Sequence, residues 1–299
     1  MESQVSEPKN YATAEAFRRA LEDRLNVLSG KEGLELARLR RMIAFERLLA
    51  RLFKPKPAPW ILKGGYALEM RFRRIARATR DIDITLPELR PLFGGPEIDS
   101  DRILSELTRA AAVDFGDWFS FQIGTASSEL ESKPYGGFRF PITAAIGERK
   151  FIVFHLDAAL GDAIVSEPDW IDGHDLLNFA GIAPARIALL PREQHFAEKI
   201  HAYTLRRNGS NSRVRDLADL ILLINEGPLD PKRAAQAVWA TFERRKTHPL
   251  PKVLPAPPET WAEPYRLIAA EISLTPEEVR EAFGLVERYW NKLKFKEYP

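Results

Sequence analysis

The sequence predicts an α/β (α+β) fold, in which a mixed β-sheet flanked by helices is followed by a helical C-terminal domain. Three observations support this prediction. Two amphipathic patterns of helical period open the chain, strand patterns then alternate with helical ones as far as residue 156, and helical patterns dominate from residue 191. We place the domain boundary near residue 185, which gives an α/β domain of residues 1–185 and a helical domain of residues 186–299.

Composition excludes several classes of protein. The chain has 299 residues, of which 45% are hydrophobic and 29% charged, so it can bury a sizeable core. The 44 basic and 42 acidic residues leave a net charge of +2, which does not indicate a partner. The absence of cysteine excludes disulfides, thiolate nucleophiles and cysteine-ligated zinc. A polar N-terminus without a long apolar run predicts a cytoplasmic protein with no membrane partner.

The first elements are two helices, predicted over residues 12–28 and 33–53, which we expect to cover one side of the sheet. Arginines make the second helix basic, and we favour a solvated surface over an RNA-facing stripe. A proline-rich stretch then ends this helix before the first strand pattern.

The stretch from residue 60 to 86 suggests a chemistry. A short strand over 60–62 turns at Lys63, Gly64 and Gly65 into a helix over 66–73, and backbone N–H groups at such a helix start bind phosphate oxygens well. The strand pattern over 79–84 places Asp81 and Asp83 on one face. Two neighbouring carboxylates repel each other unless a cation lies between them, and oxygen ligands suit Mg²⁺ that carries substrate phosphates.

Further helix and strand patterns lead to a third carboxylate. A helix is predicted over 99–113, followed by strands over 118–123, 138–146 and 150–156. Period-two alternation in the last strand puts His155 and Asp157 on one face, with Asp157 near the strand end. On the residues alone, an active-site role for Asp157 and a structural one are equally acceptable. No histidine pair has zinc-site spacing, so His155 is treated as structural or as an indirect contact.

The C-terminal domain begins with a short strand over 186–190. Helices are predicted over 191–207, 212–225, 231–245, 258–271 and 276–293. One face of the first helix is predicted to be basic, with residues at intervals of three or four: Arg192, His195, Lys199, Tyr203 and Arg206.

Together these motifs resemble the nucleotidyltransferase toxins of the AbiEii type, the MenT-like toxins of toxin–antitoxin systems. The residues that carry the resemblance are Lys63-Gly64-Gly65-Tyr66-Ala67-Leu68, Thr79-Arg80-Asp81-Ile82-Asp83, Leu156-Asp157 with Gly161-Asp162, the Ala197-Glu198-Lys199 helix, and Ser212-Arg213-Val214-Arg215-Asp216 with Asp219-Leu220. Two departures are Tyr66, where the family has a small hydroxyl residue, and Arg215, where it has lysine.

The resemblance implies a nucleotidyltransferase-like sheet and a set of site residues. Asp81 and Asp83 would bind Mg²⁺, with Asp157 as third metal ligand or general base. Lys199 and Asp216 would complete the catalytic group from the helical domain. The nucleotide-binding residues implied are Lys63, Gly64, Gly65, Thr79, Arg80 and Arg206.

The same resemblance implies a reaction and partners. An acceptor hydroxyl would attack the α-phosphate of an NTP, and pyrophosphate would leave. The acceptor would be RNA, at the tRNA 3′ end, so that translation is blocked, and a winged-helix antitoxin would be the genetic partner.

Other interpretations remain open. A small-molecule nucleotidyltransferase of the antibiotic-modifying type would use the same metal and phosphate groups, and a non-catalytic binding module would retain only a relic site. A glycosyltransferase also uses Asp-x-Asp, although the upstream Gly-Gly element argues against it. Arginines near the Asp-x-Asp strand and on the facing helices predict a basic cleft, unless carboxylates neutralise them.

Overall fold

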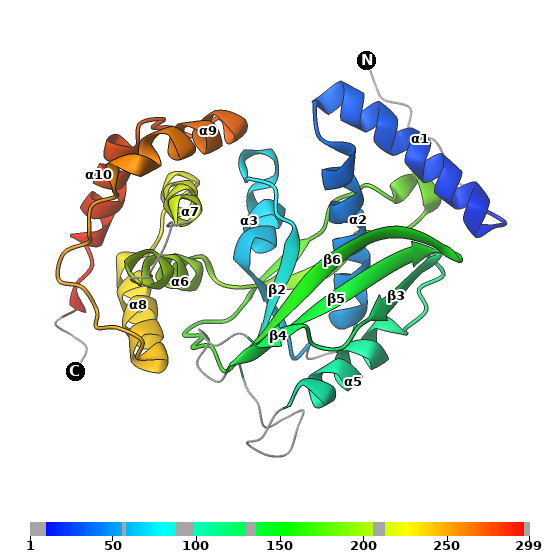
Figure 1. Cartoon of the computed structure of the whole chain (residues 1–299), viewed down its shortest axis with the longest axis horizontal. Coiled ribbons are helices and arrows are strands. Elements are labelled where there is room, and N and C mark those ends of the chain that lie inside the picture. The colour runs from blue at the N-terminus through cyan, green and yellow to red at the C-terminus, as the bar shows by residue number, and fades with distance from the viewer. Residues whose placement is uncertain (1–9, 56–57, 88–98, 130–135, 206–212, 296–299) are drawn as a thin grey trace.

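The computed structural model describes residues 10–55, 58–87, 99–129, 136–205 and 213–295, and a single sheet lies at the centre of these residues (Figure 1). Its strands are β1 Ile61–Lys63, β2 Asp81–Leu86, β3 Phe119–Ile123, β4 Ser128–Glu129, β5 Gly137–Ile146, β6 Arg149–Leu160, β7 Asp169–Asp172 and β8 Arg186–Leu189. The strand order is β3-β5-β6-β2-β1-β8-β7, with β4 paired to β5. Residues 87–96, whose prolines and glycines predict a loop, fall almost wholly outside the described residues.

The sheet is mixed, as the sequence predicts. Strand β2 runs parallel to β6, and β1 runs parallel to β8, whereas the other neighbours are antiparallel. The pairing registers place four charged residues opposite one another across four adjacent strands. From β5 to β1, this charged row contains Arg139, Asp157, Asp83 and Lys63.

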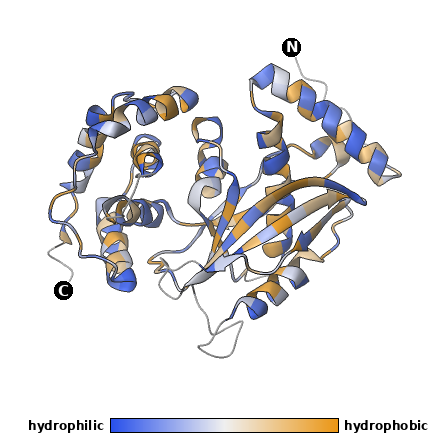
Figure 2. Cartoon of the chain, in the orientation of Figure 1, coloured by the Kyte–Doolittle hydropathy of each residue, from blue (hydrophilic) through white to orange (hydrophobic). Residues whose placement is uncertain are grey.

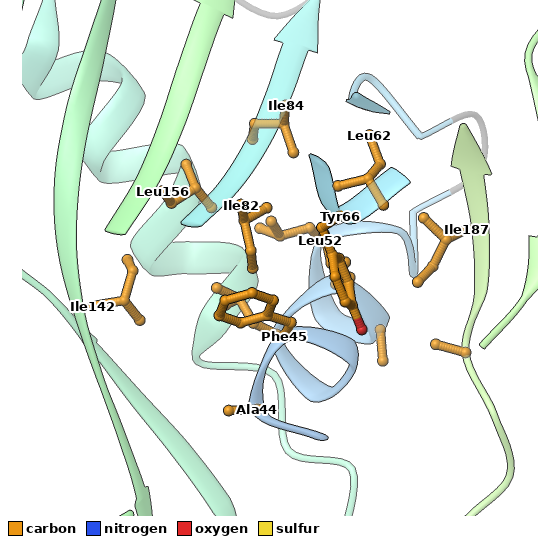
Figure 3. Close-up of a cluster of buried hydrophobic side chains, with 14 of the residues drawn as sticks. Ala44, Phe45, Leu52, Leu62, Tyr66, Ile82, Ile84, Ile142, Leu156 and Ile187 are labelled. Atoms are coloured by element: carbon orange, nitrogen blue, oxygen red, sulfur yellow. The ribbon is translucent and has the colours of Figure 1, made fainter. Parts of the chain in front are cut away.

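Three helices cover one face of the sheet: α1 Ala14–Glu32, α2 Leu36–Leu52 and α5 Ser100–Ala111 (Figure 1). The ring of Phe45 on α2 lies 4.9 Å from that of Tyr66 and 4.7 Å from that of Phe154. Ile82 and Ile84 of β2 point into the same cluster (Figure 3), so the alternating residues of β2 face the opposite side.

Tyr66 belongs to this core. Its side chain is buried, and its hydroxyl donates to the main-chain carbonyl of Met42 at 3.1 Å. The tyrosine that departs from the family motif therefore points away from the glycine turn and anchors its helix to α2.

The remaining α-helices lie to the left of the labelled strands in Figure 1. They are α3 Gly64–Phe72, α6 Arg192–Thr204, α7 Val214–Asn225, α8 Pro231–Arg245, α9 Ala262–Ile272 and α10 Val279–Trp290. A second hydrophobic cluster contains residues of every α-helix from α6 to α10. Helix α7 is the most apolar of these helices (Figure 2). Among the described residues, no helix combines the length and the apolar character needed to cross a bilayer.

The structure corrects several predicted boundaries. Strands β4 and β7 were not predicted, because both are short and lack an apolar alternation. Strand β6 extends to Leu160, past the predicted end at 156, so Asp157 lies inside the strand. The helix predicted over 258–271 begins as a 3₁₀ turn, Glu259–Trp261, before α9.

Candidate active site

A polar cleft of about 430 Å³ lies between the end of the sheet near α3 and the helices α6 and α7. It brings together most of the site residues predicted from the sequence. These are Lys63, Gly64, Gly65, Thr79, Asp81, Asp83, Asp157, Lys199 and Asp216. Arg80 is exposed and is not among the described residues that line the cleft, and Arg206 lies outside the described residues.

Strand β2 supplies the acidic pair. Asp81 and Asp83 alternate with the buried Ile82 and Ile84, so both carboxylates lie on the cleft face of the strand. Asp81 pairs in register with His155 of β6, whose Nδ1 lies 3.5 Å from Asp81 Oδ1. Asp83 pairs in register with Asp157, so three carboxylates share a small area of the sheet.

The two glycines allow the acidic strand to approach the start of α3. Gly64 has φ +67°, and a Cβ there would overlap Oδ2 of Asp83 and lie 2.8 Å from the Asp83 Cβ. A Cβ on Gly65 would lie 2.9 Å from Oγ1 of Thr79. Any larger residue at Gly64 would therefore displace the Asp83 carboxylate or the turn.

Thr79 is held by a buried carboxylate. Its amide donates to Oε2 of Glu69 at 3.4 Å, and Arg38 binds the other Glu69 oxygen at 2.7 Å. Its hydroxyl donates to the main-chain carbonyl of Asp81 at 3.4 Å. These contacts fix the entry into β2.

Arg139 of β5, which the sequence analysis does not single out, binds Asp157 through both carboxylate oxygens. The Nε–Oδ1 and Nη2–Oδ2 distances are 2.7 and 2.8 Å, and Nη2 lies 3.7 Å from Oδ2 of Asp81. The hydrogen bonds to Asp157, which outweigh partial burial, raise the pKa of Arg139. The only sequence signal for this pair is the hairpin register of β5 and β6, which the residues alone do not fix.

Lys63 is buried and paired. Its ammonium contacts Asp162 and lies 2.9 Å from Oε1 of Glu198, and Arg245 binds the same two carboxylates. Burial opposes the charged form, but Asp162 and Glu198 outweigh it and raise the pKa of Lys63. The phosphate contact predicted for Lys63 stays a prediction, and its observed contacts join β1 to α6.

Lys199 lies between two carboxylates of α7. Its Nζ is 2.9 Å from Oδ1 of Asp216 and 2.7 Å from Oδ2 of Asp219. Arg77 donates from Nε and Nη2 to the two carboxylate oxygens of Asp219, at 3.0 and 2.9 Å. Arg213 Nη1 donates to Oδ2 of Asp216 at 2.8 Å.

Electrostatics keep this group ionised. Burial disfavours the charge on Lys199, but the two aspartates outweigh burial and raise its pKa. Burial likewise opposes the charge on Asp219, but Lys199 and Arg77 outweigh it and lower the pKa of Asp219. The structure thus places a permanent ammonium ion at the cleft wall.

The prediction of a basic face on α6 is wrong in part. Tyr203 is buried, with its hydroxyl bound to the carbonyl of Pro255 at 2.7 Å, and Arg192 donates to the carbonyls of Leu223 and Gly227. Burial, followed by the charge of Lys199, lowers the pKa of His195 to about 3, so this side chain is neutral. Lys199 supplies the charge that this face brings to the cleft.

The donor set fits Mg²⁺ through two protein carboxylates. No group of three or more aspartate, glutamate or histidine side chains in the described part of the chain is arranged to hold a metal ion. Asp157 is engaged by Arg139, whereas Asp81 and Asp83 offer adjacent oxygens on one strand face. Mg²⁺ is commonly bound by one or two carboxylates together with substrate phosphates, and this pair suits that mode.

Comparisons with known proteins agree with this fold. The family model for "Nucleotidyl transferase AbiEii toxin, Type IV TA system" matches residues 47–294. The solved structure of MenT4, a nucleotidyltransferase toxin from Mycobacterium tuberculosis H37Rv, matches with a TM-score of 0.54 and 16% sequence identity, covering 93% of this chain and 99% of that chain. The predicted fold class is confirmed.

A second solved structure is more distant. The antibiotic-resistance factor ANT(2'')-Ia matches with a TM-score of 0.37 and 16% identity, covering 68% of this chain and 92% of that chain, and this similarity is too low to support an argument. No curated protein matches the sequence.

Proposed function

Since the chain belongs to the AbiEii family of nucleotidyltransferase toxins, we propose that it transfers nucleotides from an NTP to an RNA acceptor, the 3′ end of tRNA. The observation that carries the proposal is the position of Asp81 and Asp83. Both line the cleft beside the glycine turn that opens α3, and Lys199 lines the same cleft from α6. A phosphate site, an acidic pair and a fixed cation are the parts that phosphoryl transfer requires.

The proposed reaction forms one bond to phosphorus and breaks another. The acceptor hydroxyl oxygen forms a bond to the α-phosphorus of the NTP, the bond from that phosphorus to the bridging oxygen breaks, and pyrophosphate leaves. The hydroxyl proton passes to a carboxylate or to water. Mg²⁺, when bound, would neutralise phosphate charge and lower the pKa of the attacking hydroxyl.

The chain's own residues then have distinct roles. Asp81 and Asp83 hold the metal, and Gly64, Gly65 and Thr79 seat the triphosphate, which main-chain N–H groups at a helix start can bind. Lys199, positioned by Asp216, balances phosphate charge. Lys63, Arg80 and Arg206 are proposed to assist nucleotide binding. Asp157, for which the family resemblance implies a role as third ligand or base, is engaged by Arg139 through both carboxylate oxygens.

Exposed arginines near the cleft suit an RNA acceptor. Arg215 is exposed at the cleft, and Arg80 is exposed next to the acidic strand, so both can reach a phosphate chain at the rim. Most other cleft arginines are already paired with carboxylates, as Arg77 and Arg139 illustrate. By its family, the chain is also proposed to have an antitoxin partner, of the winged-helix type.

The test is direct. Purified protein is incubated with total RNA, Mg²⁺ and each labelled NTP in turn, with Asp83→Asn as the inactive control. We expect label on RNA of tRNA size, dependent on Mg²⁺ and absent with Asp83→Asn. Label on a small molecule with RNA untouched would favour the antibiotic-type enzyme, and no metal-dependent NTP binding at all would favour a relic site.

A further inference from the structure

We propose that Arg139 is a built-in counter-cation of the acidic cluster that takes the place of a second metal ion. Its guanidinium neutralises Asp157, which leaves Asp81 and Asp83 to bind a single divalent cation. This inference rests on the proposed function, because it assigns the number of metal ions at the same site.

The strand register fixes Arg139 opposite Asp157. The two residues are direct partners in the antiparallel pairing of β5 with β6, so both side chains stand on the cleft face. The main chain of Arg139 is itself held, because its carbonyl accepts from the amide of Ser127 at 2.8 Å and from the hydroxyl of Ser127 at 3.2 Å. The pair is therefore part of the sheet and not a chance contact of a long surface side chain.

The geometry leaves Asp157 little capacity for a metal. Both carboxylate oxygens accept from the guanidinium, at 2.7 and 2.8 Å, and this planar two-point contact is the strongest arrangement for such a pair. The Asp157 side chain is 12% exposed and that of Arg139 is 36% exposed, so Arg139 is the more exposed partner of the pair. A metal ion at Asp157 would have to displace two charge-assisted hydrogen bonds.

Arg139 reduces the negative charge of the acidic cluster. Its guanidinium lies 2.7 Å from Asp157 and 3.7 Å from Asp81. Without Arg139, the cluster would carry one more negative charge, which favours a further cation.

The other cations near the acidic cluster are held by other carboxylates. Lys199, Arg77 and Arg213 contact Asp216 and Asp219 on the α7 side of the cleft, and the charge of Arg77 also acts on Asp83. Lys63, at the other end of the charged row, contacts Asp162 and Glu198. Arg139 is the cation that binds Asp157 directly.

The test counts bound Mn²⁺ by electron paramagnetic resonance, in the absence of NTP and RNA. Arg139→Gln should bind one more Mn²⁺ per chain than the wild type, because Asp157 becomes available. Arg139→Lys, which keeps the charge, should retain the wild-type number. The double variant Arg139→Gln with Asp157→Asn should lose the extra ion. Equal Mn²⁺ numbers in the wild type and Arg139→Gln overturn the proposal.

If Arg139→Gln does not fold, a second measurement still tests the proposal. Asp157→Asn in the wild-type background should keep the wild-type Mn²⁺ number, whereas Asp83→Asn should reduce it. If Asp157→Asn also removes an ion, Asp157 is a ligand and the proposal is wrong. Since no nucleotide or acceptor is present, this result is independent of the transfer assay, whose failure would instead overturn the proposed function.

Discussion

Lys199 is held at the cleft wall between Asp216 and Asp219. Lys199→Met keeps the apolar stem and removes the ammonium, while Arg213 and Arg77 still neutralise the two aspartates. We expect turnover to fall by several tens of fold or more, about 2–4 kcal/mol in transition-state stabilisation, because a preorganised charge is lost. The measurement is the initial rate of nucleotide transfer at saturating NTP.

The control for this prediction is Lys252→Ala, which removes an exposed lysine away from the cleft. Its rate should match the wild type, and the thermal unfolding of all three proteins should be compared. A similar small effect from both substitutions would make Lys199 a structural residue.

His195 gives the protein a pH-dependent stability. Burial lowers its pKa to about 3 from the unfolded value of 6.5, so between these values the unfolded chain binds a proton that the folded chain does not. Stability therefore falls as the pH drops below 6.5. At pH 5 the loss from this residue is about 2 kcal/mol.

His195→Leu removes the titrating group from the buried site. Urea unfolding at several pH values should show that acidification to about pH 5 costs the variant about 2 kcal/mol less than it costs the wild type. Above about pH 7.5, the imidazole is neutral in the folded and the unfolded chain. There the free energies of unfolding of the variant and the wild type, plotted against pH, should run parallel. Parallel curves over the whole range would mean that His195 takes up a proton in the folded protein.

The sequence indicates which residue types line the cleft but not which side chains pair with one another. Asp81, Asp83 and Lys199 follow from local patterns and line one cleft. Arg139 could not be found in this way, because its contact with Asp157 depends on the register of a hairpin. Tyr203 was misplaced on a polar face because an aromatic ring with a hydroxyl fits either surface or core.

The turn from β1 into α3 depends on Gly64. Gly64→Ala would force a Cβ against Asp83 in a backbone conformation that already disfavours side chains. We expect loss of both stability and nucleotide transfer. Thermal unfolding and the transfer rate, measured on the same preparation, test this expectation.

Gly33→Ala is the matched control, because Gly33 has the same φ of +67° but nothing within 4 Å of an added Cβ. It should cost about 1–2 kcal/mol of stability from backbone strain and leave transfer unchanged. If Gly64→Ala and Gly33→Ala change stability and the transfer rate to the same extent, the close approach of Asp83 to Gly64 does not affect the transfer reaction.

Long periodic elements were predicted best. Helix α8 has the predicted bounds, since Asp230 caps it and Pro231 begins it. The two-residue strand β4 and the polar strand β7 were missed, because their partners, not their own residues, hold them in the sheet. The longer reach of β6 likewise follows from its pairing with β2 and β5.

Buried ion pairs join β1 and the segment that precedes β2 to the helices of the second hydrophobic cluster. Arg77, which leads into β2, binds Asp219 of α7, and their side chains are 16% and 3% exposed. Arg77→Gln should lower the free energy of unfolding by about 2–4 kcal/mol, because Asp219 keeps only Lys199 as a partner. Urea unfolding measures this change.

Arg266→Gln is the comparison for this pair. Arg266 and Glu263 form an ion pair within α9 whose side chains are 54% and 61% exposed, so its removal should change stability by about 0.5 kcal/mol or less. Equal losses in the two variants would show that the buried pair of Arg77 and Asp219 adds no more stability than an exposed ion pair.

The glycine at position 64 also has a genetic consequence. Every missense change in a glycine codon introduces a side chain with a Cβ, and a Cβ at this position overlaps the Asp83 carboxylate. No single amino-acid substitution at this codon therefore preserves the space that the Asp83 carboxylate occupies. In a population selected to survive expression of the protein, inactivating alleles should accumulate at this codon, whereas alleles of Gly33 should segregate as neutral passengers.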